Sequence, residues 1–175
     1  GTFSWVSQDV QKNILDIVEN FLNDFGIFYL HYMCYPGSAT LLPIQKLFNL
    51  VDSSIDEQSS KSVEIAKSLF DDLNSAGAFV DNPKIDSIIK TLNQSSEYLA
   101  HEFLTDFWNP LYSVDVHKMV YENTKTTFLG SANIVENIEN ISIPAKLQEI
   151  IKNIKAPDLK EYLKDLARNS KQRVD

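Results

Sequence analysis

Large apolar residues recur every three or four positions between residues 7 and 35, and this spacing constrains the fold more than any other feature of the chain. Side chains at that spacing lie on one side of an α-helix, so the pattern predicts a long helix from about Ser7 to Tyr35. Gly26 lies inside the pattern and costs about 1 kcal/mol relative to alanine, so two shorter helices are the alternative. The members of this stripe are Val10, Ile14, Ile17, Phe21, Phe25, Phe28, Tyr32 and Tyr35.

Helical stripes continue through the rest of the chain, and no segment alternates as a strand does. Prolines are favoured in the first turn of a helix, so Pro43, Pro144 and Pro157 each indicate a helix start. The segment from Asn82 to Phe107 carries the most regular stripe and predicts one helix of about seven turns. Helices therefore account for most of the expected structure.

These patterns predict an all-α fold, arranged as a mixed or orthogonal bundle of about seven or eight helices. A fragment of a helical-pair solenoid is the alternative architecture. The length of 175 residues corresponds to one domain, so we expect a single domain over residues 1–175. Its ends, residues 1–6 and 169–175, are expected to be flexible.

Charge is distributed unevenly along the chain. The formal net charge is −8, with 24 acidic against 16 basic residues. Residues 144–175 are nevertheless net +3, and the preceding residues are net −11. A surface that is mostly acidic repels phosphates, so the composition argues against general nucleic-acid binding.

Three further features bear on the setting of the protein. No apolar run approaches the roughly 18–20 residues of a membrane span, so no transmembrane segment is expected. The single cysteine, Cys34, excludes an internal disulfide and favours a reducing compartment, while secretion stays open. The chain begins Gly1-Thr2 rather than with methionine, which indicates an excised or processed fragment; a removed signal peptide and a residual tag glycine are both open explanations.

No residue pattern here is typical of an active site or a metal site. His31 and Cys34 are three residues apart, but a structural zinc site needs four ligands. His101 is followed by glutamate as in zinc proteases, yet Thr105 stands where the second histidine would lie. Paired carboxylates occur only among polar residues of helical stripes. We therefore expect no catalytic residue, no metal and no cofactor.

Two features could mark a binding surface. Lys160, Lys164 and Arg168 are four residues apart and form a basic strip on the last predicted helix. The strip could contact an acidic partner, could be merely solvated, or could contact the acidic body of this same chain. Trp108 and Tyr112 flank a predicted helix break, where they would act either as anchors at an interface or as core residues.

From these features we expect a non-enzymatic helical domain for protein–protein interaction, cut from a larger protein. It would hold a protein partner through Trp108, Tyr112 and the basic strip. The alternative is a secreted helical carrier that encloses a lipid or another apolar ligand. The residues that would line the cavity of such a carrier are Phe21, Phe25, Phe28, Tyr32 and Phe103.

Overall fold

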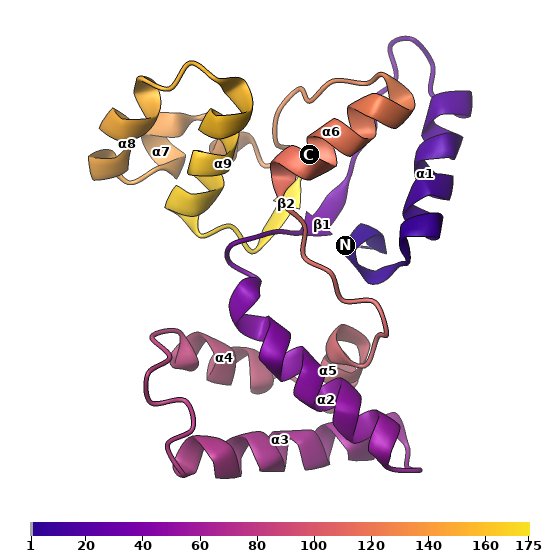
Figure 1. The fold of residues 1–175 in the computed structure, drawn as a ribbon, viewed down its shortest axis with the longest axis vertical. Coiled ribbons are helices and arrows are strands. Elements are labelled where there is room, and N and C mark those ends of the chain that lie inside the picture. Colours follow the sequence, from indigo (N-terminus) through magenta and orange to yellow (C-terminus); the bar gives the residue numbers. More distant parts are fainter. Residues whose placement is uncertain (1) are drawn as a thin grey trace. The chain divides into compact units, whose positions relative to one another are not determined.

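A computed structural model describes residues 2–175, which form two compact units (Figure 1). Unit 1 combines the chain up to Ala39 with Asn109–Asp175, and unit 2 is the intervening segment Thr40–Trp108. The described residues contain nine α-helices, three short 3₁₀ helices and one two-stranded sheet, which confirms the all-α class. The expectation of a single domain stays a prediction.

Unit 1 is built around a short antiparallel pair of strands in which Tyr32 lies opposite Arg173. Helix α1 packs against α6, and α6 packs against α9. The core between them contains Phe3, Leu15, Leu30, Tyr32, Cys34 and Val116. The elements are η1 (Thr2–Trp5), α1 (Gln8–Phe21), β1 (His31–Met33), α6 (Ser113–Thr124), η3 (Ile134–Asn137), α7 (Glu139–Ser142), α8 (Ala145–Lys152), α9 (Pro157–Arg168) and β2 (Gln172–Val174).

Unit 2 is a helical cluster in which α2 packs on α3 and both contact α5. Its core is aromatic, with the rings of Phe48 and Phe103 centred 5.3 Å apart. The Gln45 side chain donates hydrogen bonds to the carbonyls of Phe103 and Thr105 and so satisfies the end of α5. The elements are η2 (Ala39–Leu41, at the boundary), α2 (Leu42–Ser54), α3 (Ser59–Ser75), α4 (Ile85–Leu92) and α5 (Ser96–Phe103).

The long helix predicted over residues 7–35 is wrong beyond Phe21. The predicted cap at Ser7 is present, since its hydroxyl accepts a hydrogen bond from the Val10 amide. After α1 the backbone becomes extended at Leu22, and the chain turns before reaching β1. The aromatic residues from position 27 onward suit a strand as well as a helix, and pairing with β2 decides between the two.

The single helix predicted over residues 82–107 is two helices. Helix α4 ends at Leu92, and Ser95 caps α5 by accepting a hydrogen bond from the Tyr98 amide. A second cap inside a continuous apolar stripe thus interrupts the helix, and the buried residues are Ile88 and Leu92 in α4 and Leu99 and Phe103 in α5. The predicted helix starts near Pro43 and Pro157 are confirmed.

Parts of the ends predicted to be flexible, residues 1–6 and 169–175, belong to regular elements, and their flexibility stays a prediction; residue 1 lies outside the described residues. Residues 2–5 form η1 with Phe3 buried, and residues 172–174 form β2 with Arg173 buried. The first segment is short and the second is mostly polar. Both make contacts with residues that are distant in sequence.

Candidate functional site

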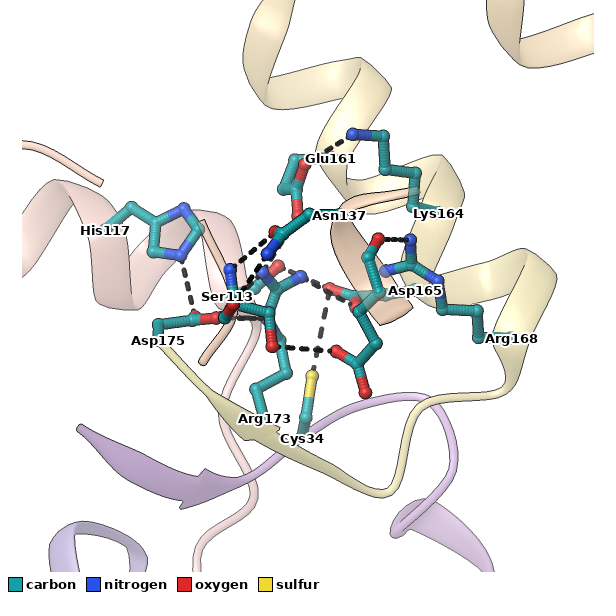
Figure 2. Close-up of polar contacts among 12 residues, drawn as sticks. Cys34, Ser113, His117, Asn137, Glu161, Lys164, Asp165, Arg168, Arg173 and Asp175 are labelled. Carbon is teal, nitrogen blue, oxygen red and sulfur yellow. Dashed lines mark hydrogen bonds and ion pairs between the residues drawn. The ribbon is translucent and has the colours of Figure 1, made fainter. Parts of the chain in front are cut away.

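The centre of unit 1 holds a buried arginine that is bound by three carboxylates (Figure 2). The Arg173 side chain is only 1% exposed. Its Nη1 donates to Asp165 at 2.9 Å, its Nη2 donates to Glu161 at 2.8 Å, and its Nε donates to Asp175 at 3.0 Å. Charged groups so far from water are tolerated only when they are paired and hydrogen-bonded, as they are here.

Local structure explains how these four side chains meet. Glu161 and Asp165 are four residues apart on α9 and therefore lie on one face of that helix. Arg173 and Asp175 are two residues apart in extended backbone, so their side chains lie on the same side. The pairing of β2 with β1 then brings Tyr32 to the same place.

Three further groups complete the arrangement, which we call the Arg173 cluster. Tyr32 donates its hydroxyl to Asp175 at 2.6 Å, and His117 Nε2 lies 2.9 Å from the same carboxylate. Ser113 donates its hydroxyl to Asp165 at 2.5 Å. The cluster therefore comprises Tyr32, Ser113, His117, Glu161, Asp165, Arg173 and Asp175, and it joins β1, α6, α9 and β2.

Opposing influences set the protonation of the ion pairs. Burial is the largest single influence on the pKa of Arg173 and acts to lower it, but the charges of Asp175 and Asp165 outweigh burial and raise that pKa. Burial likewise acts to raise the pKa of Asp175, yet the hydrogen bond with His117 and the charge of Arg173 hold it below its usual value. Arg173 and Asp175 are therefore both ionised at neutral pH.

Burial keeps the nearby Tyr32 phenol and Cys34 thiol in their uncharged forms. It raises the pKa of Tyr32 well above its usual range, and the charge of Asp175 raises it further. Burial also raises the pKa of the Cys34 thiol, with the charge of Asp165 as the next cause. Both groups stay protonated at neutral pH, so Cys34 is a poor nucleophile and Tyr32 is a hydrogen-bond donor.

A cavity of about 320 Å³ lies beside the cluster, between the loop after α1 and the loop after α6. His117 and Asp175 form part of its wall. The Phe128 ring stacks on the His117 imidazole with the centroids 4.1 Å apart. The cavity has the size of a small-molecule site and combines apolar walls with an ionic corner.

Across residues 2–175 no group of three or more His, Cys, Asp or Glu side chains is arranged to hold a metal ion.

The basic strip predicted on the last helix is engaged within unit 1. Lys160 and Lys164 both bind the Glu139 carboxylate, at 3.0 and 3.1 Å. Arg168 donates to the Glu136 carbonyl at 2.6 Å. The sequence allows three alternatives for this strip: an acidic partner, solvent, or the acidic body of the same chain. The ion pairs of Lys160 and Lys164 with Glu139 agree with the third.

The two predicted aromatic anchors belong to different units. Trp108 is buried in the core of unit 2, with its ring centred 6.2 Å from that of Phe103. Tyr112 is half-exposed in unit 1, where its ring contacts those of Tyr35 and Tyr162. Of the two predicted interface anchors, only Tyr112 is therefore exposed.

The residues predicted to line a carrier cavity are not gathered around one cavity. Phe21 and Phe25 are exposed, and Tyr32 is fully buried in the core of unit 1. Phe28 lines the cavity beside the Arg173 cluster. Phe103 belongs to the core of unit 2.

Comparison with known proteins gives a different functional setting. A model of the family described as "Predicted methyltransferase regulatory domain" matches residues 95–175. The uncharacterized protein sll1526 of Synechocystis sp. is 25% identical over 178 residues, which cover all of this chain and 35% of that protein. The uncharacterized protein RP028 of Rickettsia prowazekii is 24% identical over 131 residues, which cover 73% of this chain and 51% of that protein.

Two solved structures of PKMT2 from Rickettsia typhi share the fold. One superposes with a TM-score of 0.74 at 22% identity, and the other, a complex with AdoHcy, with a TM-score of 0.76 at 23% identity. Each comparison covers 99% of this chain but only 33% and 34% of PKMT2. The chain thus spans about a third of PKMT2 and of sll1526.

These findings overturn the expected functions. Neither a protein-docking domain nor a lipid carrier agrees with the match of residues 95–175 to a predicted methyltransferase regulatory domain. The ligand of the neighbouring structure, AdoHcy, is a small molecule and not a lipid. No helix in the described part of the chain has both the length and the apolar character needed to cross a bilayer. The matched family description concerns regulation of a methyltransferase and neither docking nor lipid transport.

Proposed function

We propose that this chain is a regulatory domain within a longer methyltransferase. The observation that carries the proposal is the match of residues 95–175 to a methyltransferase regulatory domain. That segment contributes every member of the Arg173 cluster except Tyr32. We place the chemistry of methyl transfer outside residues 1–175, since the matched family is described as a regulatory domain. About two thirds of the neighbour solved with AdoHcy lies outside the region that this chain matches.

The geometry of unit 1 supports a regulatory role. Regulation needs an element whose arrangement depends on what occupies a site. His117 contributes to the wall of the cavity and also contacts Asp175 in the Arg173 cluster. A change at the cavity would therefore alter the contacts that join α6 to α9 and β2.

Kinetics of the full-length protein test this proposal. His117→Ala removes the contact between the cavity and the cluster, whereas Lys118→Ala, one residue along on the exposed face of α6, is the matched control. We expect the first variant to change the rate of methyl transfer by about fivefold or more, the usual range of allosteric coupling. Its affinity for AdoHcy, measured by calorimetry, should stay close to that of the unmodified protein.

Two results would overturn the proposal. One is photochemical cross-linking of labelled AdoMet to a peptide within residues 1–175, which would place the methyl donor in this domain. The other is a His117→Ala variant that folds and keeps the same rate of methyl transfer as the Lys118→Ala control.

A further inference from the structure

Four large apolar side chains project into solvent from two loops of unit 1. Phe25 is 99% exposed, Ile27 78%, Tyr29 61% and Leu129 83%. We call these four residues the loop patch. Single exposed apolar residues are common, but a cluster of large ones marks a surface that another structure covers.

The loop patch is continuous rather than scattered. Phe25, Ile27 and Leu129 line one surface hollow, to which Val18 and Leu22 from the end of α1 also contribute. Ile27 and Leu129 also line the cavity beside the Arg173 cluster, and Tyr29 lies in that same wall. Two loops far apart in sequence therefore present a single apolar surface.

Local structure holds the first loop in this projecting form. Helix α1 ends at Phe21, and the Gly26 amide then donates to the Asn23 carbonyl at 2.7 Å to close a tight turn. A Cβ at Gly26 would lie 2.9 Å from that carbonyl oxygen, so only glycine fits without a shift of the backbone. The turn thus fixes the direction in which Phe25 and Ile27 project.

We infer that the loop patch is covered, in the intact protein, by the AdoHcy-binding part of the same polypeptide. This inference rests on the proposed function and names the surface through which the domain acts. About two thirds of sll1526 and of PKMT2 lies outside the region that this chain matches, so a large body of protein is available to cover the patch. Removing several large apolar side chains from water favours a permanent contact within one chain.

The position of the patch links this contact to the regulatory site. The loops that carry it also form the wall of the cavity that His117 and Asp175 line. Methyl transfer would therefore respond both to the contact and to the state of the cavity.

Photo-cross-linking in the full-length protein tests which surface covers the patch. The photoreactive residue p-benzoylphenylalanine replaces Phe25 in one protein and Val80, an exposed residue of unit 2, in the control. We expect Phe25→p-benzoylphenylalanine to give cross-links within one polypeptide to peptides outside residues 1–175. The same substitution at Val80 should give few or none.

Three results at Phe25 would overturn the inference. Cross-linked dimers on a denaturing gel would show that a second copy covers the patch. Cross-links to lipid from added vesicles would indicate a membrane surface, and an absence of cross-links would leave the patch in solvent. Each result is separate from the His117→Ala kinetics, so the inference can fail while the proposed function stands.

A functional measurement accompanies the cross-linking. Leu129→Glu in the full-length protein places a charge in the patch, and Val80→Glu is its control. We expect Leu129→Glu to change the rate of methyl transfer by about fivefold or more while circular dichroism shows unchanged helix content. Equal rates in the two folded variants would contradict the inference.

Discussion

At position 173 one guanidinium faces three carboxylates that are themselves largely removed from water. Arg173→Met keeps much of the side-chain volume but leaves Asp165, Glu161 and Asp175 without their shared cation. Breaking a buried ion pair by removing one partner costs about 3–5 kcal/mol. We expect a loss of that size in the free energy of unfolding, measured by urea denaturation followed by circular dichroism.

Lys155→Met is the control for this substitution, since Lys155 is exposed and takes part in no ion pair among the described residues. Surface changes of this kind usually stay within about 0.5 kcal/mol. Equal effects of the two substitutions would show that the cluster contributes little to stability.

Single residues also show how much of the site can be predicted from sequence. The acids Glu161 and Asp165 are visibly one helical turn apart on a predicted helix. Nothing local signals that Arg173 will meet them, because its segment is polar and close to the end of the chain. The site depends on a strand pair between residues more than 100 positions apart, and side-chain spacing carries no information about such a pairing.

At the scale of elements, the apolar period predicts helices well and strands poorly. The stripe over residues 7–35 identifies α1 and its cap at Ser7, and prolines identify the starts of α2 and α9. The same stripe does not reveal β1. A short run of apolar and aromatic residues is compatible with a helix and with a buried strand, so its spacing cannot distinguish the two. Tertiary contacts thus override the local pattern after Phe21.

The docking of η1 onto β1 gives a prediction at this scale. The Ser4 hydroxyl is buried and accepts a hydrogen bond from the Met33 amide at 2.8 Å, while Gln11 donates to the Phe3 carbonyl at 2.7 Å. Ser4→Ala leaves the buried Met33 amide without an acceptor, which costs about 1–3 kcal/mol. We expect the midpoint of urea unfolding to fall accordingly.

Ser53→Ala serves as the matched control for the η1 contact. The Ser53 hydroxyl also makes a hydrogen bond, to the Leu50 carbonyl, but it is exposed, so water replaces the lost contact. The two variants should differ by at least about 1 kcal/mol. A Ser4→Ala protein as stable as the Ser53→Ala protein would mean that η1 is not held by this contact.

At the scale of the whole molecule, unit 2 is an insertion whose two ends are held by unit 1. The Tyr35 amide donates to the Leu111 carbonyl at 3.0 Å, and the Leu111 amide donates to the Met33 carbonyl at 2.9 Å. If unit 2 unfolded alone it would become a loop of about 70 residues with fixed ends, and closing such a loop costs about 4 kcal/mol. This cost couples the two units, whatever their contacts.

We therefore expect residues 1–175 to unfold in one transition, as the single-domain prediction requires. Each unit contains one tryptophan, Trp5 in unit 1 and Trp108 in unit 2, so each fluorescence signal can be isolated. In the Trp108→Phe protein, fluorescence follows unit 1, and in the Trp5→Phe protein it follows unit 2. For each variant the urea midpoint of fluorescence should coincide with that of circular dichroism.

A core substitution in unit 2 makes the same test more demanding. Phe48→Ala removes a fully buried ring and should lower the free energy of unfolding by about 3–5 kcal/mol. The Trp5 signal is followed in a protein that also carries Trp108→Phe. If the units are coupled, the urea midpoint of Trp5 fluorescence falls together with the midpoint of the helix signal. If Trp5 keeps its original midpoint while helix content falls earlier, the chain contains two domains, and the closure cost of the insertion is too small to join them.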